Sequence, residues 1–182
     1  TEEFLAKAKG ELSITGTVQP FLMVGGEEYP SGIAGLIAGR LAEEFYRPSI
    51  VYEVGESTAS GSARSIPEFD VVGALSQCRD LLQRFGGHPG AAGFALLKEN
   101  LEPLQRRLLE IAEQQLAGVD LRPHLTIDAI LPLSGIGGKT YRLVERFAPF
   151  GHQNPMPVFL SRRAAVVDHY TIGNASQHPK LR

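Results

Sequence analysis

Cysteine and long hydrophobic runs are almost absent from this chain. The single Cys78 cannot form a disulfide within the chain or a cluster of thiolate metal ligands. It falls on the apolar stripe of a predicted helix, so we expect a buried and unreactive thiol. No apolar run approaches the roughly 20 residues that span a bilayer, and the first residues lack the basic segment of a secretory signal. These absences predict a cytoplasmic protein with no membrane partner.

The charges are distributed unevenly along the 182 residues. Residues 1–120 carry ten Lys and Arg against seventeen Asp and Glu, a net charge of −7. Residues 121–182 carry eight against three, a net charge of +5. A basic segment attached to an acidic one favours a polyanionic partner for the second part, although surface Lys and Arg also serve simply to solvate a face.

Residues 20–117 alternate between strand and helix patterns, which predicts an α/β domain with a mixed sheet and flanking helices. Residues 1–19 are predicted to be the end of a helix and a linker. Asp70 and Asn100 are expected to cap the helices that follow them. Helices are predicted at 1–12, 32–46, 71–82 and 101–117, and strands at 21–24, 50–52, 61–65 and 94–97.

A different pattern begins after a predicted linker at 118–123. Residues 124–182 contain strand patterns at 124–131, 157–160 and 164–170, a short helix at 139–147, and the start of a strand at the end of the chain. Because a β-rich module needs its edges paired or covered, this ending predicts a module that is cut short.

The most informative segment is Gly86–Phe94, in which four glycines and two alanines surround His88. Glycine lets another group approach the backbone closely, and a packed core would not use this composition. The run predicts a loop whose peptide N–H groups bind an anion, with a ring N–H of His88 as a further donor. The alternative is a simple glycine-rich turn between a helix and a strand.

Four blocks in this order carry a family resemblance. Gly86–Gly93 resembles the GGHxxAAG motif of the DHH-associated domain of DHH phosphoesterases, and Ser31–Leu41 resembles the helix that opens that domain. Gly61–Asp70 resembles a block of RecJ-type single-stranded-DNA exonucleases, and Ala148–Phe159 resembles part of their OB-like domain. The first block alone would also fit other phosphoesterases and an editing-linked domain of alanyl-tRNA synthetases. The resemblance implies a DHH-associated domain at 20–117 and a truncated OB-like domain at 124–182.

The resemblance also implies a phosphate-binding role for these blocks. Arg64 can grip a phosphate through two parallel hydrogen bonds, His88 can donate to a phosphate oxygen and assist catalysis, and an ion pair of Arg64 with Glu68 or Asp70 is the alternative. Alternation along a strand places Ser62, but not Ser65, on the face of Arg64. The expected phosphate-binding residues of this part are Ser62, Arg64, Ser65, Gly86, Gly87, His88, Gly90 and Ala91.

In the second module we expect Lys139, Arg162 and Arg163 to contact a nucleic-acid backbone. The segment Leu133–Thr140 ends in Gly-Lys-Thr, yet Leu133 stands where a Walker A loop needs its first glycine. ATP binding is therefore not the favoured interpretation of Lys139.

What the resemblance implies for function is a single-stranded-DNA-binding, C-terminal part of a 5′→3′ exonuclease of DNA repair and recombination. The catalytic DHH domain, with its Mn²⁺ or Mg²⁺, is expected to precede residue 1, so the fragment alone is expected to be inactive. One departure is Tyr29-Pro30-Ser31, where RecJ-type proteins usually carry Trp-His-Pro. The alternatives are a phosphodiesterase of short oligonucleotides and a non-catalytic nucleic-acid-binding or editing-linked module.

Overall fold

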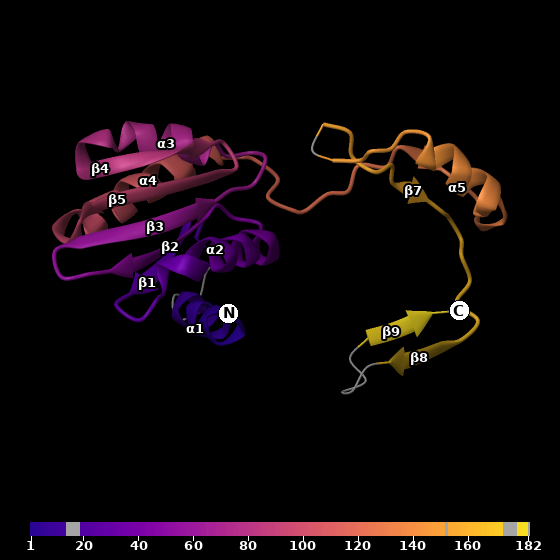
Figure 1. The fold of residues 1–182 in the computed structure, drawn as a ribbon, viewed down its shortest axis with the longest axis horizontal. Helices are drawn as coiled ribbons and strands as arrows, with labels where there is room; N and C mark the ends of the chain where they lie inside the picture. Colours follow the sequence, from indigo (N-terminus) through magenta and orange to yellow (C-terminus); the bar gives the residue numbers. More distant parts are fainter. Residues whose placement is uncertain (14–18, 152, 173–177, 182) are drawn as a thin grey trace. The chain divides into compact units, whose positions relative to one another are not determined.

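The computed structural model describes residues 1–13, 19–151, 153–172 and 178–181. His152 of the fourth sequence block and Arg182 at the predicted last strand lie outside them. The chain divides into two compact units, Thr1–Pro123 and His124–Arg182 (Figure 1). The division falls at the end of the predicted linker 118–123, and Gly118 adopts a φ of +76° there, which a glycine accommodates without strain.

The first unit is built on a mixed sheet, as the sequence predicts, but the sheet has five strands where the sequence patterns predict four. The strand order is β1-β2-β3-β5-β4, with β1 and β2 parallel and the other neighbours antiparallel. β4 is therefore an edge strand. The strands are β1 (Leu22–Gly26), β2 (Ser49–Val54), β3 (Thr58–Arg64), β4 (Leu82–His88) and β5 (Ala91–Leu97).

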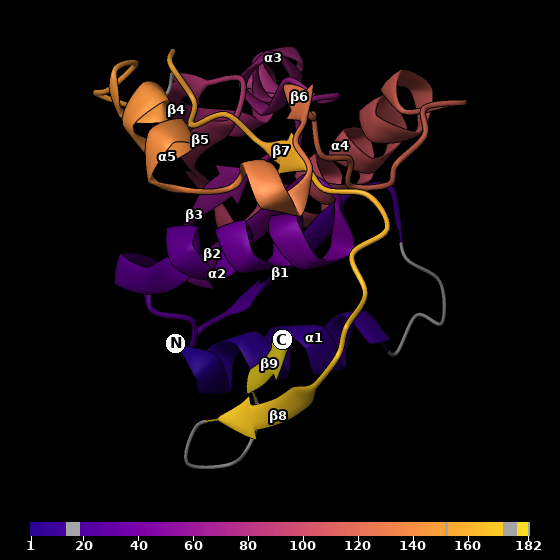
Figure 2. The ribbon, with the colours of Figure 1, turned by 90° about the vertical axis from the view of Figure 1, so that its right-hand side faces the viewer.

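Helices cover the two faces of this sheet unequally. α1 (Glu2–Ser13) packs beside α2 (Ser31–Phe45), as Figure 2 shows, and their apolar residues meet Val24 and Val51 on one face. α2 contacts β2 and β3. The other face packs Ile50, Phe94 and Leu96 against α3 (Val71–Gln77) and α4 (Leu101–Gln115). Within the described residues of the first unit, no helix lies over β5 and β4 on the α2 side of the sheet.

The helix predicted over 71–82 is wrong in its second half. α3 ends at Gln77, a 3₁₀ turn η1 (Arg79–Leu81) follows, and Leu82 begins β4. Leu82 pairs with Leu96, and Phe85 packs against the main core. The same apolar residues that fit a helical stripe thus fit a half-buried strand, and tertiary pairing decides between the two.

The two predicted helix caps have different outcomes. Asp70 caps α3, because its Oδ1 accepts a hydrogen bond from the backbone N–H of Gly73 at 2.9 Å. Asn100 precedes α4 at the end of the 3₁₀ turn η2 (Lys98–Asn100), but its amide donates to the carbonyl of Leu81 at 2.9 Å instead. Asn100 therefore ties α4 to the start of β4 and makes no capping hydrogen bond.

The second unit contains less regular structure than predicted. The strand expected at 124–131 is reduced to β6 (Ala129–Ile130), and the strand expected at 164–170 begins only at His169. Proline lacks an N–H for the ladder, and Pro132, Pro155 and Pro157 interrupt this unit. The other elements are η3 (Leu133–Gly135), α5 (Gly138–Glu145), β7 (Phe159–Leu160), β8 (His169–Ile172) and β9 (His178–Leu181).

We predict that Cys78 of the native protein resists alkylation. Its side chain is fully buried, and burial raises the pKa of the thiol to about 11, so little thiolate forms near neutral pH. Iodoacetamide at pH 8 should label the native chain far more slowly than the chain in urea, as measured by mass spectrometry. Equal rates in the two conditions would contradict the burial of this residue.

Candidate nucleic-acid interface

The glycine-rich run forms a β-hairpin, which corrects the predicted loop. Gly86, Gly87 and His88 belong to β4, Ala91 to Gly93 belong to β5, and Pro89-Gly90 form the two-residue turn between them. Half of the peptide groups of β4 pair with β5, and the other half face outward along the sheet edge. A ligand thus meets a flat sheet and its edge, and no coiled nest of N–H groups is present here.

The turn of this hairpin is fixed to the segment that follows β3. The backbone N–H of Ser65 donates to the carbonyl of Gly90 at 3.0 Å, and that of Val71 donates to the carbonyl of Pro89 at 3.1 Å. The ladder between β3 and β5 pairs Arg64 with Ala91. Two blocks that are separate in the sequence are thereby joined at one end of the neighbouring strands β3, β5 and β4.

This pairing gathers five of the eight predicted site residues of the first unit on one face. Arg64 lies opposite Ala91, which lies opposite His88, and Ser62 lies opposite Gly93. Because side chains alternate along a strand, Ser62, Arg64 and His88 all face the α2 side. Gly86 and Gly93 leave the surface between these polar groups flat.

Arg64 is held against α2 at a position where α2 has no side chain. Its Nη1 donates to the carbonyl of Ala63 at 2.8 Å, and a Cβ built on Gly35 would lie 2.8 Å from its Nη2. Gly39 also borders the Arg64 stem. Within the described residues Arg64 forms no ion pair with Glu68 or Asp70, so the alternative of a surface ion pair does not hold.

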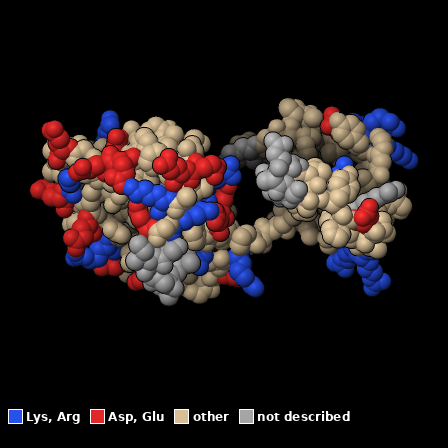
Figure 3. All heavy atoms as spheres, turned by 90° about the horizontal axis from the view of Figure 1, so that it is seen from below, with Lys and Arg blue, Asp and Glu red and all other residues tan. Residues whose placement is uncertain are grey.

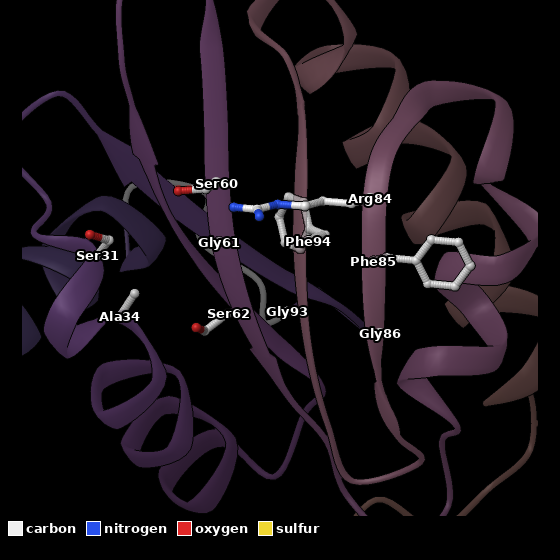
Figure 4. Close-up of a pocket in the computed structure, with 10 residues that line it drawn as sticks. All are labelled: Ser31, Ala34, Ser60, Gly61, Ser62, Arg84, Phe85, Gly86, Gly93 and Phe94. Atoms are coloured by element: carbon white, nitrogen blue, oxygen red, sulfur yellow. The ribbon is translucent and has the colours of Figure 1, made fainter.

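A pocket of about 360 Å³ opens over this uncovered half of the sheet. Figure 4 shows Arg84 reaching from β4 across β5 toward Ser60, while the ring of Phe85 points away from the pocket. None of the lining residues is acidic. They are Ser31, Ala34, Ser60, Gly61, Ser62, Arg84, Phe85, Gly86, Gly93 and Phe94.

Arg84, Ser60 and Ser31 were not predicted from the sequence. Arg84 stands two residues before Gly86 and four before His88, so alternation places it on their face once the run is recognised as a strand. The alternation that places Arg84 on this face was therefore present in the sequence, but it could not be used while residues 82–90 were assigned to a helix end and a loop.

Three predicted residues have roles that the geometry explains without a ligand. The Ser65 hydroxyl donates to the carbonyl of Phe69 at 2.7 Å, which closes the segment after β3. Gly90 accepts the hydrogen bond of Ser65 in the hairpin turn. Gly87 faces the opposite side of the sheet from Gly86 and has a φ of +148°.

The remaining predicted residues belong to the second unit. Lys139 lies in the first turn of α5, and Arg162 and Arg163 follow β7; all three are exposed. The hydroxyl of Thr140 donates to the carbonyl of Gly135 at 2.5 Å, so this loop is held by its own contacts. In Figure 3 acidic side chains are spread over the first unit, and few are visible on the second.

The described residues contain no group of three or more His, Cys, Asp or Glu that could hold a metal ion. The described residues therefore provide no set of ligands for a divalent ion.

No helix in the described part of the chain is long and apolar enough to cross a bilayer.

Comparisons with known proteins agree on the assignment of both parts. The family model described as the DHHA1 domain matches residues 16–117, and the model described as the RecJ OB domain matches residues 127–182. The single-stranded-DNA-specific exonuclease RecJ of Bacillus subtilis is 37% identical over 168 residues, which are 91% of this chain and 21% of that protein. The RecJ protein of Thermus thermophilus is 33% identical over 71% of this chain and 18% of its own length.

Solved structures give the same result. The crystal structure of RecJ in complex with Mn²⁺ from Thermus thermophilus matches 99% of this chain and 27% of that chain, with a TM-score of 0.76 and 26% identity. The structure of the same protein with Mg²⁺ matches 86% of this chain, with a TM-score of 0.62. The chain thus spans about a fifth of the length of the curated relatives it matches.

We predict that alanine destabilises the protein at one of the two adjacent glycines of β4 and not at the other. A Cβ on Gly87 would lie 2.2 Å from the carbonyl oxygen of Ala91, and its φ disfavours any side chain. Gly87→Ala should therefore lower the free energy of unfolding by about 1–3 kcal/mol. Gly86→Ala, where a Cβ meets nothing within 4 Å, is the matched control. Urea unfolding followed by circular dichroism measures both, and equal stabilities would contradict the hairpin geometry.

Proposed function

Since this chain belongs to the RecJ family, as its DHHA1 domain followed by a RecJ OB domain indicates, we propose that it binds single-stranded DNA across the uncovered half of its mixed sheet. The observation that carries this proposal is the placement of Arg64, Ser62 and His88 on one face, around a floor of glycine and alanine. Each of the three side chains can donate a hydrogen bond to a phosphate oxygen.

The chemistry of this face suits a phosphodiester backbone. The guanidinium of Arg64 offers parallel donors that match two phosphate oxygens. Gly86, Gly93 and Ala91 project little from the sheet, so a strand of nucleic acid can lie close to the backbone. His88 is then a positioning donor, because it lies on the same face as Arg64 and can donate a hydrogen bond to the same phosphate backbone.

The same proposal assigns the hydrolytic step to the part of the relatives that this chain does not span. Relatives have been solved with Mn²⁺ or Mg²⁺, and a divalent ion would there polarise the phosphate and activate water. The present chain would hold the phosphate backbone for that step, in a 5′→3′ exonuclease of DNA repair and recombination in the cytoplasm. Lys139, Arg162 and Arg163 of the OB domain are proposed to extend the contact along the DNA backbone.

We predict weak, salt-sensitive binding of single-stranded DNA that depends on Arg64. For single strands, the slope of log K against log salt changes by about 0.7 for each phosphate contact. Arg64→Gln should weaken binding about fivefold to tenfold and make this negative slope less steep by about 0.7. Fluorescence anisotropy of labelled oligo-dT with EDTA present measures binding separately from any metal-dependent cleavage.

Arg106→Gln is the matched control for this measurement. Arg106 lies on α4, which packs on the opposite face of the sheet, and its exposed ion pair with Glu102 contributes little to stability. A wild-type affinity that does not change with salt would refute phosphate recognition. Equal losses in the Arg64 and Arg106 variants would refute its location.

A second prediction concerns the glycine of α2 that makes room for Arg64. Gly35→Ala should not destabilise the protein, since alanine favours a helix by about 1 kcal/mol and the Nη2 it meets can move. It should nevertheless displace the guanidinium and weaken DNA binding severalfold. Melting temperature and anisotropy, measured on the same sample, separate these two effects.

Gly32→Ala provides the control within the same helix. A Cβ at Gly32 meets nothing within 4 Å, so this variant should bind DNA as the wild type does. If both alanine variants bound with wild-type affinity, the contact between α2 and Arg64 would have no part in DNA binding.

A further inference from the structure

We propose that Arg84, with Ser60 and Ser31, forms a second phosphate-binding position on the same sheet face, so that this domain selects a polynucleotide over a single nucleotide. The inference rests on the proposed function and extends it from one phosphate to two. It concerns residues that the sequence motifs leave out.

The first argument is the position of Arg84 in the sheet. Arg84 lies opposite Ala95, and Ala95 lies opposite Ser60. Arg64 and His88 flank Ala91 in the same way, four residues further along the strands. At about 3.3 Å per residue, the two polar pairs are separated by about 13 Å along the sheet. A floor of small residues, with Gly86 and Gly93 at its middle, lies between them.

The second argument is the state of the Arg84 side chain. Arg84 is exposed and forms no ion pair or side-chain hydrogen bond with any other residue in the described ranges. Its guanidinium extends across β5 toward Ser60 (Figure 4), although no acidic residue lines the pocket. An arginine with no partner in a pocket of hydroxyl groups and backbone is matched by an anion with several acceptor oxygens, such as a phosphodiester.

The third argument is the wall of the pocket on the α2 side. Ser31 is the first residue of α2 and lines the pocket, and Pro30 before it offers no capping side chain. The positive end of the helix dipole therefore lies beside the same space as Arg84. Hydroxyl groups of Ser31 and Ser60 add donors that suit the remaining phosphate oxygens.

The test compares Arg64→Gln, Arg84→Gln and the double variant in the full 182-residue chain, with an eight-nucleotide oligo-dT as the probe. Two separate phosphates predict that each single variant makes the negative salt slope less steep by about 0.7 and that the double variant makes it less steep by about 1.4. Substitutions at sites this far apart should also have additive effects on the binding free energy. Arg84→Lys keeps the charge and should keep the wild-type slope.

The outcomes separate this inference from the proposed function. If Arg64→Gln makes the salt slope less steep and Arg84→Gln has the same slope as the Arg106→Gln control, the second phosphate-binding position does not exist and the first remains. If the double variant is no worse than either single variant, both arginines hold one phosphate and the inference is wrong. The inference is also wrong if Arg84→Lys makes the salt slope less steep by as much as Arg84→Gln does. If the wild-type chain does not bind the oligonucleotide, the proposed function itself fails.

Discussion

The two backbone hydrogen bonds at the tip of the β4–β5 hairpin are the constraint on which the site depends. Through them the carbonyls of Pro89 and Gly90 are tied to Val71 and Ser65. They fix the hairpin turn beside the end of β3, where Arg64 emerges. β4 is an edge strand held by its ladder to β5 and by the packing of Phe85 on the core, and these two bonds add a fixed point at its far end, beside His88 and Arg64. Their donors and acceptors are main-chain atoms, so the constraint survives most side-chain changes at these four positions.

Because helices cover the sheet unevenly, β4 and β5 have one face that packs in the core and one face that no helix of the first unit covers in its described residues. On the α3 and α4 side, Phe94 and Leu96 fill a conventional core. On the α2 side, residues 91–95 of β5 and 84–88 of β4 carry glycine, alanine and the polar side chains of Arg84 and His88. Within the described residues of the first unit, no helix packs on these small residues. They keep the surface flat, which suits an extended polymer whose charges repeat along its length.

The sequence predicted the α/β class, the mixed sheet and most helices, because those follow from long apolar patterns such as that of α2. It also singled out Arg64 and His88 as candidates, since they lie in blocks with a family resemblance, and the sheet pairing places both on one face. It failed at residues 78–90, where a short apolar stripe suits a helix and a strand equally well. Arg84 was missed for that reason: its face depends on a pairing with β5 that no local pattern reveals. The short strands of the second unit were overestimated, because an apolar run cannot show which partner, if any, it will pair with.

The burial of the only thiol has a practical consequence for the study of this surface. Because Cys78 is closed off beneath α3 and α4 and the chain has no other cysteine, a cysteine introduced on the sheet face would be the sole reactive thiol of the molecule. A spin label or fluorophore attached at Ser60 or Ser62 would then report from one known place. The wild-type sequence thus already provides the unlabelled background that such site-directed spectroscopy normally has to engineer.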